Sequence, residues 1–171
     1  MGLFHKSIEK RMDAFSLGID KVWADGFDYE EEIFNFCTRN ESSMAKFFEF
    51  NTKSSEAMID PEIPQLTKDM LVVQTAALFD LVNKTIPDFG DMVHKSKAPI
   101  EEARAFREVM IKDMQKMADY KKNAALAERT MTRFENTLTE YQKSHEIIGK
   151  RIVRVKTDFW EAEKYFNSLR N

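Results

Sequence analysis

A heptad pattern in the C-terminal part of the chain constrains the fold more than any other feature. Two heptad positions, spaced alternately by three and four residues, run from Ala103 to Leu169, and 18 of their 20 residues are apolar, where the overall composition would give about nine. A generic amphipathic helix with a period of 3.6 residues would drift off this spacing, so the pattern indicates a coiled-coil seam. The exceptions, Asp113 and His145, are interpreted as packed or register-setting polar residues.

The seam predicts a long helical section over residues 99–169. Unbroken, it would be about 105 Å long at about 1.5 Å per residue. A turn within Lys121–Asn123 or near Gly149 could interrupt it without changing the phase of the seam. In either case a long, narrow apolar stripe needs partners along its length, so we expect an elongated molecule that associates with itself as a homodimer.

Three earlier segments also carry helical periodicity. Residues 1–25 read as an amphipathic N-terminal helix that an Ala-Asp-Gly sequence ends, and residues 28–58 read as a second helix. Pro61 and Pro64 push the residues before them out of helical geometry and predict a break. A third helix is predicted over residues 64–96, and its apolar face is expected to comprise Leu66, Met70, Val73, Ala77 and Leu81.

The predicted fold class is therefore all-α. We expect residues 1–171 to form a single domain, an elongated antiparallel coiled-coil bundle of three or more long, kinked helices. Five glycines and four prolines are too few to punctuate a β-rich fold, and 43% apolar residues suffice for a sizeable core.

Composition also bears on location. The single cysteine, Cys37, excludes an internal disulfide framework and fits a reducing compartment, and we interpret it as a small core residue. No apolar run reaches the 18 or more residues, roughly, that a membrane-spanning helix needs. The sequence predicts a cytoplasmic protein that is not integral to a membrane.

The residues needed for a catalytic or metal site do not occur in useful patterns. His5, His94 and His145 lie far apart without ligand partners at suitable spacing, and no Gly-rich phosphate loop, nucleophile elbow or paired zinc cysteines are present. Neighbouring carboxylates such as Glu101 and Glu102 point about 100° apart on a helix and form no dyad. We expect a protein that is not an enzyme and has no cofactor and no metal.

Charge is distributed unevenly. Residues 1–91 hold nine basic and 17 acidic residues, whereas residues 92–157 hold 15 basic and nine acidic ones. The heptad position farthest from the seam is rich in cations and has no acidic residue: Lys122, Arg129, Asn136, Lys143, Lys150, Thr157 and Lys164. Such lysines often serve only solubility, but a line of positive charge on a stiff rod also suits an extended anionic surface. Lipid headgroups fit better than nucleic acid, because the net charge is −3 and no aromatic platform accompanies the cations.

Several segments of the chain form a recognisable layout. An amphipathic stretch covers Met1–Trp23, a helix covers about Asp28–Ala57, and a second helix begins at Pro64. That second helix passes through Ala98-Pro99-Ile100-Glu101-Glu102, and Met117–Lys122 is basic and aromatic. This layout resembles a BAR domain, whose second helix has a proline kink before a long charged run and a basic and aromatic stretch near the arm tip.

The resemblance implies a crescent-shaped dimer that binds anionic phospholipid membranes through a basic concave surface and inserts its N-terminal helix into one leaflet. Carried onto this chain, it predicts membrane contacts at Leu3, Phe4, Lys6, Ile8, Lys10, Arg11, Lys121, Lys122, Lys150, Arg151, Arg154 and Lys156. The predicted function is then a dimeric, cytoplasmic, peripheral-membrane scaffold that senses or shapes curvature. The alternative is a coiled-coil adaptor that binds other helical proteins and no lipid.

Overall fold

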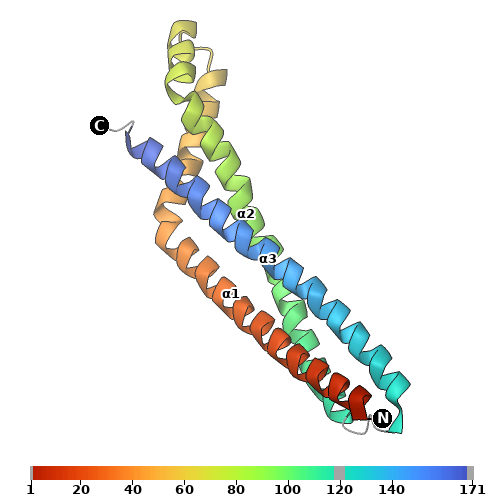
Figure 1. Cartoon of the computed structure of the whole chain (residues 1–171). Coiled ribbons are helices and arrows are strands. Elements are labelled where there is room, and N and C mark those ends of the chain that lie inside the picture. The colour runs from red at the N-terminus through yellow and green to blue at the C-terminus, as the bar shows by residue number, and fades with distance from the viewer. Residues whose placement is uncertain (1, 118–121, 169–171) are drawn as a thin grey trace. The chain divides into compact units, whose positions relative to one another are not determined.

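The computed structural model describes residues 2–117 and 122–168, with the side chains of residues 2–7, 74 and 116 outside the description. Within the described residues the chain is all-α: helices α1 (Gly2–Ile59), α2 (Gln65–Lys116) and α3 (Ala124–Ser168) follow one another, and no strand occurs among them (Figure 1). The predicted all-α class is confirmed.

The helices contribute to two compact units, each with a stretch of all three. Unit 1 consists of Met1–Glu31 and Lys95–Gly149, and unit 2 of Glu32–His94 and Lys150–Asn171. Contacts give the direction of the helices in unit 1. Arg11 binds Glu128 and Glu135 of α3, whereas later α1 residues meet earlier α2 residues, as in the Asp20–Arg107 and Glu30–Arg104 pairs. Helix α2 is therefore antiparallel to α1. Helix α3 is parallel to α1, since Gly18 lies beside Leu138 and Gly26 beside His145.

In the core of unit 1, one apolar face from each of the three helices packs together. Phe15 of α1 packs against Phe106 of α2 and Phe134 of α3, with ring centroids 6.4 and 5.5 Å away. The buried residues of this core are Ile8, Phe15, Ile19, Val22, Ala103, Met110, Met131, Phe134 and Leu138. The residues from α2 and α3 are largely those of the predicted heptad seam.

The core of unit 2 is rich in phenylalanine. Phe159 of α3 packs against Phe36 and Phe47 of α1, with ring centroids 5.2 and 5.3 Å away, and farther along the helices Phe166 contacts Phe47 and Phe50. Ion pairs border this core, among them Lys84–Asp158 at 2.9 Å and the Arg154–Asp88 pair at 2.9 Å.

The seam residues that the structure describes are buried or half-buried, as predicted, whereas Tyr120 and Leu169 lie outside the described residues. The reason given for self-association was wrong. Ala103, Met131, Ile148, Val155 and Ala162 are all buried within the chain. The predicted long section folds back on itself, since α2 ends at Lys116 and α3 begins at Ala124, so neighbouring helices of the same chain cover the seam. Asn123 caps α3 by accepting a hydrogen bond from the Leu126 N–H at 3.1 Å.

Two further predicted boundaries are wrong. Helix α1 continues through Ala24–Gly26, and α2 continues through Pro99. Packing explains the glycine, because a Cβ on Gly26 would lie 3.1 Å from Ile100 and 3.4 Å from His145, so glycine permits a close approach of three helices. Ser96 and Ile100, on either side of Pro99, are each 1% exposed, and their burial outweighs the local loss of one helical hydrogen bond. The break near Pro61 and Pro64 is confirmed.

Two helical glycines differ in their surroundings, and this gives a testable contrast. Gly90 has no heavy atom within 4 Å of a built Cβ, so Gly90→Ala should stabilise the protein by about 0.5–1 kcal/mol through helix propensity. Gly26→Leu should destabilise it by about 1–3 kcal/mol, because the new side chain has no space beside Ile100. Urea unfolding followed by circular dichroism measures both, and equal effects of the two substitutions would contradict the close approach at Gly26.

Candidate functional site

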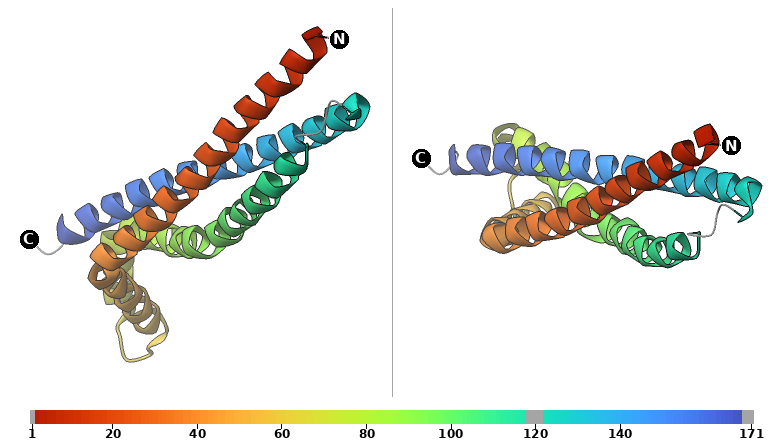
Figure 2. Two further views of the ribbon diagram at one scale, coloured as in Figure 1. Left: turned by 90° about the horizontal axis from the view of Figure 1, so that it is seen from below. Right: turned by 60° about the horizontal axis from the view of Figure 1, so that its bottom comes forward.

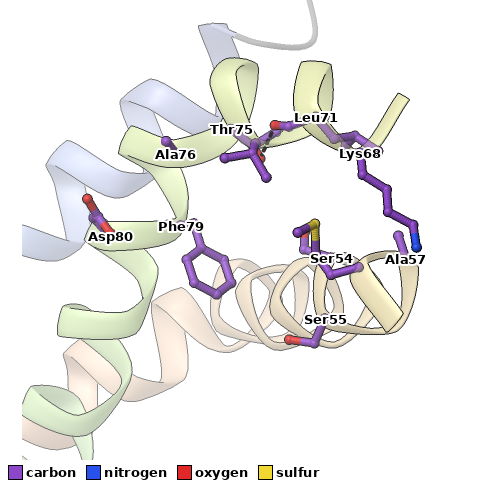
Figure 3. Close-up of a pocket in the computed structure, with 11 residues that line it drawn as sticks. Ser54, Ser55, Ala57, Lys68, Leu71, Thr75, Ala76, Phe79 and Asp80 are labelled. Carbon is purple, nitrogen blue, oxygen red and sulfur yellow. Dashed lines mark hydrogen bonds between the residues drawn. The ribbon is translucent and has the colours of Figure 1, made fainter. Parts of the chain in front are cut away.

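An apolar groove lies in unit 2, between the last turns of α1 and the first turns of α2 (Figure 3). Its volume is about 510 Å³. Apolar side chains, among them Met58, Leu71 and Phe79, form much of its wall, and Figure 3 shows Phe79 directed into the space between the helices. The complete lining is Ser54, Ser55, Ala57, Met58, Lys68, Leu71, Val72, Thr75, Ala76, Phe79 and Asp80.

The turn between α1 and α2 builds this groove. The Asp60 carboxylate accepts a hydrogen bond from the Glu62 N–H at 2.8 Å, and the Pro64 carbonyl accepts from the N–H groups of Thr67 and Lys68. The chain therefore reverses within a few residues and α2 returns alongside α1 as a helical hairpin (Figure 2). Short side chains at Ser54, Ser55 and Ala57 leave the space between the two helices open.

The hairpin around the groove is acidic. Residues 48–80 contain six acidic and two basic side chains. One of the two, Lys53, pairs with Glu49 at 2.5 Å, and the other, Lys68, lines the groove together with Asp80. A ligand with an apolar face and positive flanks matches an apolar wall carried by an acidic hairpin.

The same hairpin exposes a second apolar surface on α2. Leu66, Met70, Val73 and Ala77 were predicted to face the core, but all four are exposed, and Val73 retains 81% of its accessible surface. The sequence analysis did not predict the groove, because it assigned a single apolar face to this helix. Gln65–Phe79 has only two charged residues and is apolar on both sides. That composition was the available signal, because a helix that is apolar all round needs cover on more than one face.

Of the apolar residues predicted to enter a membrane near the N-terminus, only Ile8 has a described side chain. Leu3, Phe4 and Lys6 have side chains outside the described residues. Ile8 is fully buried in the core of unit 1, because the apolar face of α1 packs against α2 and α3.

The two cations of this stretch lie differently. Lys10 is exposed. Arg11 donates hydrogen bonds to Glu135 at 2.6 and 2.7 Å and is bound by Glu128, and these carboxylates raise its pKa, while Arg11 lowers the pKa of Glu135. Arg11 therefore joins α1 to α3 in unit 1.

Several cations predicted on the last helix are also engaged within the chain. Arg154 is bound by Asp88 at 2.9 Å and Lys156 by Glu32, so both neutralise carboxylates in unit 2. Arg151 is half-buried, whereas Lys122 and Lys150 are exposed. Lys121 lies outside the described residues.

The outward heptad positions of the seam are correctly assigned. All seven residues predicted to point away from the core are exposed: Lys122, Arg129, Asn136, Lys143, Lys150, Thr157 and Lys164. Two apolar side chains at other positions of α3 in unit 2 are also exposed, Val153 at 64% and Trp160 at 55%.

His145 was predicted to be a packed polar residue of the seam, and it is 2% exposed. Its ring lies 5.9 Å from that of Tyr29, and neither of its ring nitrogens has a hydrogen-bond partner. Burial lowers the pKa of His145, nearby Asp25 opposes this, and nearby Arg104 adds to it. The imidazole is therefore neutral at neutral pH.

The structure also bears on the other candidate groups. Cys37 is half-buried, and burial raises the pKa of its thiol, which disfavours the reactive thiolate. In the part of the chain that the structure describes, no group of three or more His, Cys, Asp or Glu side chains is placed to hold a metal ion. Likewise, no helix found there combines the length and the apolarity needed to cross a bilayer.

Comparison with known proteins adds no relative. No protein-family model, no curated protein and no solved structure matches this chain.

The burial of His145 predicts how the stability of the protein depends on pH. The unfolded state, with a histidine pKa of about 6.5, takes up a proton more readily than the folded state, so stability falls as the pH drops through about 6.5. His145→Met should reduce this loss, because the substituted side chain has no charge to bury. Urea midpoints at about pH 7.5 and about pH 5.5 measure the difference between the two proteins. An identical loss in both would contradict the assignment of the effect to His145.

Proposed function

We propose that this protein is a helical interaction module that binds an amphipathic helix of another protein in the α1–α2 groove. The observation that carries the proposal is an open apolar groove of about 510 Å³ between two antiparallel helices. Grooves of this kind receive a partner helix through apolar anchors at i, i+3, i+4 and i+7. This is the adaptor alternative of the sequence analysis, moved from the seam to the hairpin.

The charge of the hairpin indicates the chemistry of the partner helix. Six carboxylates and two lysines in residues 48–80 favour a partner that carries lysine or arginine on both sides of an apolar stripe. Apolar burial supplies most of the binding free energy, at about 25 cal/mol per Å² before the costs of association. The acidic hairpin favours a positively charged partner and speeds its association at low salt.

Two model peptides of equal length test this function. Both place leucine on one helical face, and the remaining positions are lysine in one peptide and glutamate in the other. The lysine peptide should bind at least tenfold more tightly than the glutamate peptide. This preference should decrease as salt screens the charges of the hairpin. Fluorescence anisotropy of labelled peptides measures both affinities.

A matched pair of variants locates the binding. Ala76 lines the groove, whereas its neighbour Ala77 lies on the exposed stripe. Ala76→Trp should lower the affinity for the lysine peptide at least tenfold, because the indole occupies the groove. Ala77→Trp should leave this affinity within about twofold of that of the parent protein. Equal binding of the lysine peptide to the parent protein and to Ala76→Trp would refute the groove as its site.

Peripheral binding to anionic membranes is a second proposal. It is favoured by the exposure of the outward positions of α3, among which Lys143 and Lys164 are cationic, and by Trp160, since tryptophan suits a membrane interface. The resemblance to BAR domains adds the dimeric scaffold and the curvature preference to this proposal. It ranks second because Ile8 is buried and Arg11, Arg154 and Lys156 already bind carboxylates.

Charge reversal separates the two proposals. Lys143→Glu with Lys164→Glu should reduce co-sedimentation with phosphatidylserine vesicles at low salt by tenfold or more, since each cation near an anionic surface contributes about 1 kcal/mol. Lys21→Glu with Lys46→Glu is the control, because both lysines are exposed on α1 and the change in net charge is the same. An equal loss of co-sedimentation in the two double variants would show that only net charge matters. Failure of the parent protein to sediment with the vesicles would contradict the lipid proposal.

A further inference from the structure

The methionines of the chain differ in their access to solvent. Nine of the ten have described side chains, and two of these, Met58 and Met70, are 45% and 54% exposed. A reagent in solution therefore reaches these two first among the described methionines. The other seven are buried or half-buried: Met12, Met44, Met92, Met110, Met114, Met117 and Met131.

The two exposed methionines belong to the same helical hairpin but lie on different surfaces. Met58 is in the last turn of α1 and lines the apolar groove. Met70 is near the start of α2, on the exposed surface of that helix and outside the lining of the groove. The hairpin thus contains a matched pair of thioethers with similar exposure, one inside the proposed binding site and one outside it.

Met58 supplies most of the apolar wall that α1 contributes to the groove. The other lining residues of α1 are Ser54, Ser55 and Ala57, which are small, and two of them carry hydroxyl groups. A flexible, polarisable thioether suits contact with the apolar anchors of a partner helix. A change that makes this one side chain polar therefore removes the main apolar contact that α1 can offer.

Hydrogen peroxide brings about such a change in methionine. The sulfur attacks one peroxide oxygen, the O–O bond breaks as the S–O bond forms, and the second oxygen leaves as water after proton transfer. The sulfur loses the two electrons that the peroxide gains. The resulting sulfoxide is polar, and a polar group that loses its water without gaining a hydrogen-bond partner costs free energy. An oxidised wall therefore opposes the burial of leucine side chains against it.

We propose that Met58 is a peroxide-oxidation site that controls the groove, because its conversion to methionine sulfoxide lowers the affinity for the partner helix. This inference rests on the proposed groove function. The modification is reversible, since methionine sulfoxide reductases restore the thioether. Binding and oxidation also oppose each other, because a helix seated in the groove covers Met58 and leaves Met70 open to solvent.

Peptide mapping by mass spectrometry tests where oxidation occurs. A Cys37→Ser background removes the thiol as a second target, and the leucine–lysine peptide contains no methionine. Under mild hydrogen peroxide, Met58 and Met70 should be oxidised at least tenfold faster than the buried methionines. A saturating concentration of the lysine peptide should slow oxidation of Met58 at least threefold and leave the rate at Met70 within about twofold. Equal protection of both residues by a peptide that binds, or oxidation of Met58 no faster than that of Met131, would overturn the proposal.

The affinity for the lysine peptide, measured before oxidation and after removal of the peroxide, tests the effect on binding. Oxidation should lower this affinity at least tenfold in the Cys37→Ser protein and equally in Met70→Leu. In Met58→Leu it should change the affinity by less than about twofold, because leucine cannot be oxidised. Reductases specific for each of the two sulfoxide epimers should together restore the affinity. An equal loss on oxidation in Met58→Leu and Met70→Leu would contradict the role of Met58.

A polar substitution provides the same test without an oxidant. Met58→Gln has a similar length and a polar end, so it should lower the affinity for the lysine peptide at least tenfold. Met70→Gln is its control and should stay within about twofold of the parent protein, and circular dichroism checks that both variants remain folded. Retained affinity in a folded Met58→Gln would overturn this inference alone. Failure of the untreated parent protein to bind the lysine peptide would instead refute the groove function, and the regulation with it.

Discussion

Aromatic packing of α3 against α1 is the interaction on which the rest of the structure depends. In unit 1 Phe134 contacts Phe15, and in unit 2 Phe159 contacts both Phe36 and Phe47. These rings bury large apolar areas and make α3 the element that completes both cores. Because the same chain supplies all three helices, the heptad seam is buried within the chain and needs no partner to cover it.

The reach of α3 determines where apolar surface is left over. Its contacts with α1 extend to Phe50, through Phe166, and Figure 1 shows the hairpin end of unit 2 standing clear of α3. Beyond that point two helices must cover each other without a third. Small side chains on the facing sides then leave a groove, and the outer side of α2 remains exposed. The proposed partner helix would take the place of a third helix in the groove.

Charge explains why these apolar surfaces rank above the predicted lipid contacts. Cations that look available in the sequence are used to join helices: Arg11 joins α1 to α3 through Glu128 and Glu135, and Lys156 joins the same helices through Glu32. Such pairs are partly exposed and each contributes modestly to stability. They nevertheless compete with lipid phosphates for the same guanidinium and ammonium groups, and this competition lowers the gain from membrane binding.

The sequence by itself determined that the chain is helical, that its helices break near Pro61 and Pro64, and that one side of α3 faces a core while the other faces water. Those properties follow from local propensity and from hydrophobic periodicity, which a single chain displays directly. It also anticipated the burial of His145, because a seam position is buried whichever helix covers it. Only the tertiary structure decided which helix covers which face. The continuity of α1 through Gly26 depends on the approach of Ile100 and His145, and the exposure of Leu66, Met70 and Val73 depends on the absence of a third helix beside them. Periodicity marks a face as apolar, but it carries no information about the neighbour that buries it.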